Sequence, residues 1–414
     1  MRKLLIIALL VSCKNPNYCE GRNPDNNCDE APVDGTTSGS DAEAFDCVSM
    51  GCSGGKVCDT SSHACVTCID NNTCSGATPV CSNDACTGCT LNSQCASDAC
   101  LPTGACAAAT DVAYVSPSGT GDCKTKATAC PTMQAAQGLA RPVIRLNGAI
   151  ANEHVSVMTN TTILGNDTGT TSSLANALAS DLLDISGAST TVVIEHVTFI
   201  GVAGNTGGVS MLVSDLSHLP SLEIRECTIT GVSGTGVFAN GGTVTVERST
   251  IAHNTSGGLS LGTSTVHVRN VFVTDNGPTS TFGGLNLVGS TGTVEFSTIV
   301  NNTGNNDGNS RGVLCGAMNV TLDSVLLQGN SNSQTSGSGC TFEYSNFWPD
   351  TTFPTGTGNV GHMVTFKSAT DYHLVLNSPM KDIANPSSTV MDDIDGNSRP
   401  QGQIRDIGAD ELMP

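Results

Sequence analysis

The strongest pattern in the chain is a repeat that extends from about Thr190 to Phe347. Each copy is 22 to 30 residues long and contains short apolar runs. No copy is long enough to bury its own apolar face, so neighbouring copies must stack on one another. β-type runs at this period, with no helical pattern between them, predict an all-β parallel β-helix in which each coil adds about 4.8 Å. The first apolar marker of each copy is Ile194, Ile224, Val246, Val268, Val294 or Leu322, and the second, five residues later, is Phe199, Ile229, Ile251, Val273, Ile299 or Leu327.

Polar and glycine positions keep register with these markers. Four copies carry Asn three residues after the second marker, and we expect the amides to form a hydrogen-bonded ladder between coils. A Gly then precedes another residue that faces the core, and we interpret these Gly residues as turn positions with positive φ. The Asn residues are Asn254, Asn276, Asn302 and Asn330, and the Gly pairs are Gly208-Val209, Gly236-Val237, Gly258-Leu259, Gly284-Leu285, Gly312-Val313 and Gly339-Cys340.

A charged column follows the first markers directly: Glu195, Arg225, Glu247, Arg269, Glu295 and Asp323. The sign alternates up to the final pair, and opposite charges on neighbouring strands contribute about 0.2–1 kcal/mol each and help to set register. We favour this register-setting interpretation over a row of catalytic acids and bases. Glu295 and Asp323 depart from the alternation, and we interpret them as solvated, with a bound cation as the alternative.

The chain has 20 Cys, and 12 of them form three units of four, each about 20 residues long. The units are Cys47, Cys52, Cys58 and Cys65; Cys68, Cys74, Cys81 and Cys86; and Cys89, Cys95, Cys100 and Cys106. Such units bury too little apolar surface to fold without disulfides, and each allows three connectivities. Zinc at the Cys65/Cys68 and Cys86/Cys89 pairs is the alternative, but these pairs straddle unit boundaries.

The remaining Cys residues divide by position. We expect Cys19 to pair with Cys28, and Cys123 with Cys130 in a small loop before the solenoid. Cys315 is two residues after Val313, which the repeat aligns with Cys340, so we predict a Cys315–Cys340 bond. Cys227 lies in an inner column and is predicted to be a buried, inert thiol.

The N-terminus predicts export. Arg2 and Lys3 precede the apolar run 4–11, which is too short to span a bilayer. Leu10-Val11-Ser12-Cys13 resembles the lipobox of bacterial lipoproteins, which implies lipidation of Cys13 and anchoring to the outer membrane or cell surface. The alternative is an ordinary cleaved signal peptide with Cys13 in a disulfide.

Composition narrows the function classes. The formal net charge is −20 with 17 Lys and Arg in no basic cluster, so nucleic-acid binding is disfavoured. An acidic surface also repels polyanionic sugars unless cations intervene. Charged residues make up 13% and aromatics 4% of the chain, which suits a polar β-solenoid and not a helical protein.

These patterns predict five regions: a signal peptide at 1–12, a flexible tether at 13–46, the Cys repeats at 47–106, the β-helix at 112–350 and a C-terminal cap at 351–414 that closes the far end. A short helix in Pro131–Ala140 is expected to cover the first coil. Leu174–Asp184 is expected to be an insertion or an irregular coil.

The C-terminal motifs Asp371-Tyr372-His373-Leu374, Asp393-Ile394-Asp395-Gly396-Asn397 and Asp406-Ile407-Gly408-Ala409-Asp410-Glu411 resemble those of bacterial right-handed parallel β-helix proteins of the pectin-lyase-like superfold, in particular the group with a choice-of-anchor Q domain. The resemblance covers roughly residues 112–414 and implies export and surface display, with no known activity. The Cys units separately resemble repeats on surface lipoproteins of myxobacteria.

The acidic C-terminal motif has two physical interpretations. Arg399 is among the few cations near Asp392, Asp393, Asp395 and Asp406, and we favour ion pairs that hold the cap together. The alternative is a calcium site at Asp393, Asp395 and Asn397, whose oxygens alternate before a turn, although the later ligands of an EF-hand loop are absent. We therefore expect no cofactor, with calcium as the exception.

Two function classes remain. We favour a non-catalytic, lipid-anchored surface module for binding, adhesion or envelope architecture, with polysaccharide or another envelope component as partner. The alternative is a polysaccharide lyase or glycoside hydrolase, which needs a base or paired carboxylates. The residues to test first for catalysis are Glu226, Glu247, Arg248 and His253, since Glu226 matches Arg248 one coil earlier; exposed charges on a regular coil are the simpler interpretation.

Overall fold

The computed structural model describes residues 46–176, 178–202, 204–213, 215, 217–279, 282–304, 312–316 and 318–413. The chain divides into two compact units, Met1–Val66 and Thr67–Pro414. The predicted signal peptide, nearly all of the tether and the residues Cys13, Cys19 and Cys28 lie outside the described residues. Among the helices that are described, none has the length and apolarity that a membrane crossing requires.

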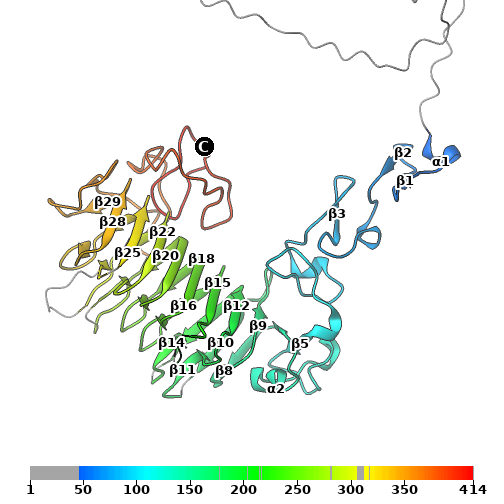
Figure 1. Ribbon diagram of the computed structural model, residues 1–414, viewed down its shortest axis with the longest axis horizontal. Helices are drawn as coiled ribbons and strands as arrows, with labels where there is room; N and C mark the ends of the chain where they lie inside the picture. Colours follow the sequence, from blue (N-terminus) through cyan, green and yellow to red (C-terminus); the bar gives the residue numbers. More distant parts are fainter. Residues whose placement is uncertain are drawn as a thin grey trace, which may run out of the picture. The chain divides into compact units, whose positions relative to one another are not determined.

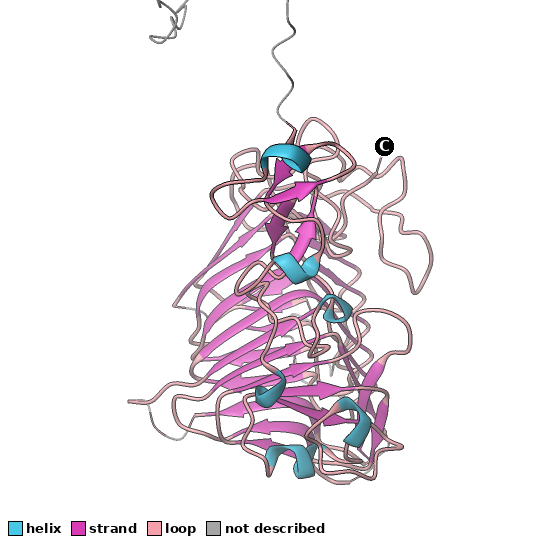
Figure 2. Cartoon of the chain, turned by 90° about the vertical axis from the view of Figure 1, so that its right-hand side faces the viewer, coloured by secondary structure: helices cyan, strands magenta, loops and turns pink. Residues whose placement is uncertain are grey.

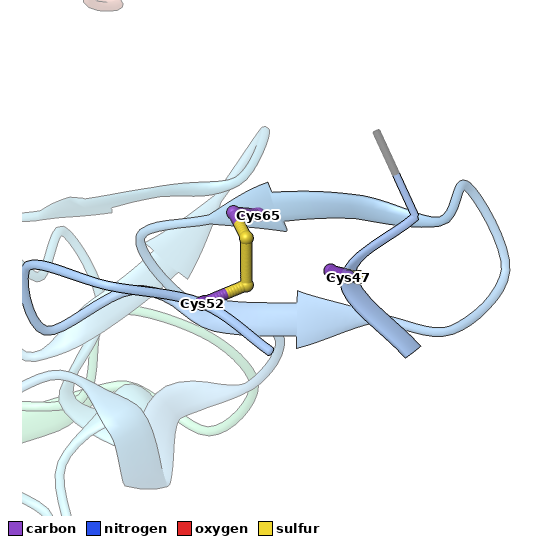
Figure 3. Close-up of side chains that lie close together, drawn as sticks. All are labelled: Cys47, Cys52 and Cys65. Carbon is purple, nitrogen blue, oxygen red and sulfur yellow. A yellow bond between two sulfur atoms is a disulfide. The ribbon is translucent and has the colours of Figure 1, made fainter. Parts of the chain in front are cut away.

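The described part of the first unit is one cysteine repeat. Helix α1 (Cys47–Met50) precedes a two-stranded antiparallel hairpin, β1 (Val57–Asp59) and β2 (Ala64–Val66). Cys47 bonds to Cys58, and Cys52 bonds to Cys65, the second bond being drawn in Figure 3. These bonds replace the apolar core that so short a segment cannot build.

The second and third repeats begin the larger unit. The second contains η1 (Asn71–Thr73) and the hairpin β3 (Val80–Ser82) and β4 (Ala85–Thr87), and the third contains η2 (Asn92–Gln94). Their disulfides are Cys68–Cys81, Cys74–Cys86, Cys89–Cys100 and Cys95–Cys106. All three repeats therefore join the first Cys to the third and the second to the fourth. These bonds occupy the sulfur atoms that the zinc alternative required.

The rest of the larger unit is a parallel β-solenoid built from three rows of strands (Figure 1). The first row is β5 (Val112–Val115), β6 (Val143–Leu146), β9 (Thr161–Leu164), β12 (Thr191–Glu195), β15 (Ser221–Arg225), the first halves of β18 (Thr243–Ala252) and β20 (Thr265–Thr274), β22 (Thr291–Glu295), β25 (Asn319–Asp323) and β28 (Cys340–Glu343). The second row is β7 (Ala149–Ala151), β10 (Ser172–Asn176), β13 (Val197–Gly201), β16 (Thr228–Thr230), the second halves of β18 and β20, β23 (Thr298–Val300), β26 (Leu326–Gln328) and β29 (Asn346–Trp348). The third row is β8 (Val155–Val157), β11 (Asp181–Ile185), β14 (Gly207–Leu212), β17 (Val237–Asn240), β19 (Leu259–Gly262), β21 (Leu285–Asn286), β24 (Val313–Leu314) and β27 (Thr335–Ser336).

The strand register confirms the apolar repeat. Each first marker pairs with the next along the first row, as in Ile224 with Val246 and Val246 with Val268. The second markers do the same in the second row, as in Ile229 with Ile251. All of these markers are buried in one continuous core, because alternate side chains of a strand point to the same face.

The asparagine ladder is present and runs through the interior. Asn254 donates from Nδ2 to Oδ1 of Asn276 at 3.0 Å, Asn276 donates likewise to Asn302 at 3.0 Å, and Asn302 to Asn330 at 2.9 Å. Gln334 accepts from Nδ2 of Asn330 at 2.7 Å and ends the ladder. All four Asn residues are buried.

The glycine column serves a different purpose from the one the sequence suggested. The positive-φ interpretation was wrong for five of the six positions, since Gly208, Gly236, Gly258, Gly284 and Gly312 are not left-handed, and it is confirmed at Gly339, whose φ is 89°. A Cβ on Gly258 would lie 2.6 Å from Val273 Cγ1 and 2.7 Å from the carbonyl oxygen of Gly284. Glycine is therefore required because the neighbouring coil and the Asn ladder approach the backbone closely.

The N-terminal end of the solenoid is covered as predicted. Helix α2 (Met133–Gln137) begins after Thr132, whose side chain accepts from the Ala135 N–H, and Met133 and Ala136 are buried in the core of the first coils. Two 3₁₀ turns, η3 (Ala109–Asp111) and η4 (Lys126–Thr128), flank β5. The Cys123–Cys130 bond closes the predicted loop. Figure 2 shows that helices are few and short in the described chain.

The third cysteine repeat packs on the solenoid. Ala99 and Ala107 are buried with Val112, Tyr114 and Val143 in a separate small core. Tyr114 donates its hydroxyl to the Ser97 carbonyl at 2.8 Å, and Arg145 Nε donates to the Asp98 carbonyl at 2.7 Å. The third repeat is therefore a fixed part of the larger unit, which the sequence boundary at residue 106 did not indicate.

Two further expectations about the coils were wrong. The described residues of Leu174–Asp184 are regular: they contribute to β10 and β11, which pair in parallel with β13 and β14. Val313 pairs with Thr335, whereas Cys340 pairs with Val320, so the last repeat was misaligned. The Cys315–Cys340 disulfide is nevertheless present, because the turn before β28 brings Cys340 beside the preceding coil.

The C-terminal segment does more than close the far end. Phe353 packs against the core of the last coils, but the chain beyond it returns along the second row (orange to red in Figure 1). There Tyr372, Ile407 and Ala409 cover Phe272, Phe296 and Leu326, which are apolar residues on the outer surface of the coils. The C-terminal segment is needed along the side of the solenoid, because these outward side chains would otherwise be exposed to water.

Candidate functional site

A second charged column stands at the bend between the first and second rows. His196, Glu226, Arg248 and Asn270 occupy this position in four successive coils, with φ of 57°, 50°, 41° and 55°. The left-handed bend turns each coil from one row to the next, and the four side chains lie one above another. Each residue directly follows a member of the predicted charge ladder.

Hydrogen bonds and ion pairs join this column into a chain. His196 Nδ1 lies 3.2 Å from Glu226 Oε2, and Arg248 Nε donates to Glu226 Oε1 at 3.1 Å. Arg248 Nη1 donates to Asp392 Oδ2 of the C-terminal segment at 2.6 Å. Asn270 Nδ2 donates to Asp392 Oδ1 at 3.1 Å. We name these five residues the bend network.

Arg248 is held as a cation. Burial opposes its charge, but the hydrogen bonds and charges of Glu226 and Asp392 outweigh burial and raise the Arg248 pKa above its ordinary value. A guanidinium bound by two carboxylates has no tendency to accept a proton from a substrate. The geometry therefore disfavours Arg248 as a general base.

The bend network borders a cleft of about 570 Å³, within the range of small-molecule sites. Outward threonines of the second row, Thr228, Thr230 and Thr250, form its floor. Its described lining residues are His196, Glu226, Cys227, Thr228, Thr230, Arg248, Thr250, Ala252, His253, Phe272, Thr274, Thr370, Asp371, Tyr372, His373, Ile394 and Asp395. Among them Arg248 is the one Arg or Lys.

A smaller hollow adjoins the cleft at the bend network. Its volume is about 220 Å³, and it lies between the third cysteine repeat and the charge ladder, with Glu195, His196, Glu226 and Arg248 in its lining. Burial raises the pKa of Glu195 to about 7, against the opposing effect of Arg225. His196, Glu226 and Arg248 line both hollows, so the two form one polar surface across the bend.

The four catalytic candidates are only partly brought together. Glu226 and Arg248 are bonded to each other, and His253 lines the same cleft. Glu247 belongs instead to the charge ladder: its oxygens lie 3.4 Å from Arg225 Nη1 and 3.1 Å from Arg269 Nη2. These contacts support the register-setting interpretation of the ladder.

Of the calcium candidates, Asp393 has both side-chain oxygens engaged in hydrogen bonds. Asp393 is buried, and its Oδ1 accepts from the N–H groups of Asp395 at 2.9 Å and Asn397 at 2.8 Å. Its Oδ2 accepts from Asn397 Nδ2 at 3.3 Å and from the Glu411 N–H at 3.2 Å. Asp393 closes the turn with these bonds, and such a geometry does not favour calcium.

The ion pair that holds the C-terminal segment has a different partner from those predicted. Arg399 is 1% exposed and its Nη1 donates to Glu411 Oε2 at 2.9 Å. It also donates to the backbone carbonyls of Asp392, Asp406 and Gly408, and its guanidinium lies 4.7 Å from the Phe296 ring centroid.

Cys227 is buried and free, and burial raises its thiol pKa to about 12, which agrees with the predicted inert thiol.

Sequence reasoning did not place His196, Asp371, His373 or Asp392 in this site. His196 was recoverable, since it follows Glu195 as Glu226 follows Arg225. Asp392 was not, because it meets Arg248 across 144 residues of chain. The outward column of the second row also held a usable signal: Thr228 and Thr250 line the open cleft, Phe272 lies where the cleft ends, and Leu326 in the same column is covered.

One comparison with known proteins, the scan against family models, agrees with the fold. The family model described as "Right handed beta helix region" matches residues 185–377, and no curated protein matches the chain. A solved structure titled "Crystal structure of pectate lyase Pel9A" is similar over 72% of this chain and 96% of that chain, with 15% identity and a TM-score of 0.39. The family model supports a right-handed parallel β-helix, and neither comparison assigns an activity.

Proposed function

We propose that the protein is a non-catalytic surface module that binds a neutral polysaccharide in the cleft beside the bend network. The observation that carries this proposal is the pairing of Arg248 with both Glu226 and Asp392. The Arg or Lys base that lyases of this superfold use would need to be free to take a proton. Here the guanidinium is neutralised by two carboxylates.

The surface chemistry of the cleft suits an uncharged, hydroxyl-rich chain. Threonine hydroxyls and imidazoles offer donors and acceptors, and Phe272 and Tyr372 add apolar surface at one end. The net charge of −20 disfavours a polyanionic ligand. A segment of neutral polysaccharide is the ligand class that matches both features.

Removing one hydroxyl from the cleft floor tests this binding. Thr250→Val keeps the side-chain shape, and we expect it to weaken retention of a neutral polysaccharide about threefold to tenfold, as for a lost neutral hydrogen bond of about 0.5–1.5 kcal/mol. Thr245→Val is the matched control, because Thr245 also faces outward on β18 but lies on the first row, outside the cleft. The measurement is affinity electrophoresis of the full oxidised chain through gels that contain neutral or acidic polysaccharides.

Two outcomes would contradict the proposal. Equal retention of Thr250→Val and Thr245→Val would remove the cleft as the binding surface. Release of unsaturated or reducing sugar ends by the wild-type chain, abolished in Arg248→Ala, would establish the lyase or hydrolase alternative.

We further propose that Cys13 carries a lipid anchor in the outer membrane, which the lipobox-like run Leu10-Val11-Ser12-Cys13 supports. In a bacterial host we expect the wild-type chain to incorporate labelled palmitate and to sediment with membranes, whereas Cys13→Ala is unlabelled and released. Cys227→Ala is the control and should retain the label, because Cys227 is a buried thiol in the solenoid. An unlabelled wild-type chain would contradict the anchor.

A further inference from the structure

Three side chains of the C-terminal segment converge where the cleft ends. They are His373, Asp395 and Asp410, and their ligand atoms all lie within 4.8 Å of one another. His373 Nε2 lies 3.0 Å from Asp395 Oδ2. Asp395 is half exposed and free to adjust, whereas Asp410 is 6% exposed and fixed by the Leu374 N–H, which donates to its Oδ2 at 2.6 Å.

The orientation of His373 is set from its other nitrogen. Nδ1 lies 2.5 Å from Asp371 Oδ1, which also accepts the His373 N–H at 3.1 Å. The ring packs edge-on against Phe272, with centroids 5.2 Å apart. A carboxylate that accepts from one imidazole nitrogen fixes the tautomer and presents the lone pair of the other nitrogen, which is the usual arrangement behind a metal-bound histidine.

The second nitrogen is left without a hydrogen-bond partner among the described residues. Nε2 is shielded from solvent, and although Asp395 Oδ2 is close, the two are not aligned for a hydrogen bond. In the neutral tautomer that donates Nδ1–H to Asp371, the Nε2 lone pair faces the carboxylates of Asp395 and Asp410. With a neutral imidazole, such a cluster is electrostatically unfavourable unless a metal cation lies between its members.

We propose that His373, Asp395 and Asp410 bind a divalent transition-metal ion, with zinc as the best match. One imidazole and two carboxylates supply three ligands of the kinds that zinc accepts at about 2.0–2.2 Å. Calcium fits less well because it prefers oxygen ligands throughout. His373 and Asp395 also line the cleft, so the remaining coordination position is accessible to water from there.

The test is calorimetric titration of Zn²⁺ into the full, oxidised and chelator-treated chain, with Mn²⁺ and Ca²⁺ in parallel. We expect one Zn²⁺ per chain, tighter than Mn²⁺ or Ca²⁺. Asp371→Asn removes only the orienting carboxylate and should weaken Zn²⁺ about 10- to 100-fold, the effect of an outer-shell partner. Asp395→Asn removes a ligand and should weaken it more.

Asp184→Asn is the matched control. Asp184 forms a comparable pair with His154, at 2.6 Å from Nε2, but the pair belongs to no convergent three-ligand group among the described residues. Its Zn²⁺ affinity should equal that of the wild type. We expect Asp395→Asn to fold like the wild type, because the Asp395 side chain is 52% exposed. Absence of a stoichiometric Zn²⁺ site in the wild-type chain, or one unchanged by Asp395→Asn, would overturn the proposal.

Discussion

Replacing Arg399 with Met is expected to destabilise the folded chain by about 3–5 kcal/mol, the typical cost of removing one partner of a buried ion pair. The side chains of Arg399 and Glu411 are 0% and 1% exposed. Without the guanidinium, the Glu411 carboxylate and the carbonyls of Asp406 and Gly408 lose a buried donor. The measurement is guanidinium chloride unfolding of the full oxidised chain, followed by the fluorescence of Trp348, its single Trp.

The control for this prediction is Arg269→Met. Arg269 is one-third exposed and pairs with Glu247 at 3.1 Å in the charge ladder, so its replacement should cost less than about 1 kcal/mol. The double variant Arg399→Met with Glu411→Gln should recover part of the loss, since it leaves no uncompensated buried charge. Equal destabilisation by Arg399→Met and Arg269→Met would refute the assignment of Arg399 as the residue that holds the C-terminal segment.

The solenoid was predictable because its core repeats. Val246 must pair with a residue like itself in each neighbouring coil, so the period of the sequence is the period of the structure. The same rule placed Glu226 and Arg248 one above the other. It failed at Val313 and Cys340, where the last coil changes length: Gly312 precedes β24 of the third row, whereas Gly339 precedes β28 of the first row.

The candidate site was less predictable because half of it does not repeat. Asp392, Asp371 and His373 come from a segment without periodicity that folds back along the coils. The calcium hypothesis has a related weakness: alternating oxygens in 393–397 are also typical of a turn, and two N–H groups of that turn donate to Oδ1 of Asp393. Cysteine spacing identified the three repeats, but the first-to-third connectivity depends on hairpin geometry that the spacing does not contain.

Asn276→Ala is expected to destabilise the solenoid by at least about 3 kcal/mol, because each buried group left unsatisfied costs about 1–3 kcal/mol. Asn276 accepts from the N–H and the Nδ2 of Asn254, and it donates to the Ile251 carbonyl and to Asn302. Four buried groups therefore lose a partner at once. Chemical unfolding measures the total loss in the free energy of unfolding. Amide hydrogen exchange at Asn254 reports the local effect, since the Asn254 N–H donates directly to Asn276 Oδ1.

Asn286→Ala is the control, because it removes an asparagine that is not part of the ladder. Asn286 lies on β21 of the third row, is partly exposed, and donates to Ser260 Oγ at 3.2 Å. Water replaces that bond, so we expect a loss below about 1 kcal/mol, as for surface substitutions away from special features, and unchanged exchange at Asn254. If Asn276→Ala behaved like Asn286→Ala, water would have to fill the place of the amide, and the stacked apolar columns alone would account for the stability of the coils.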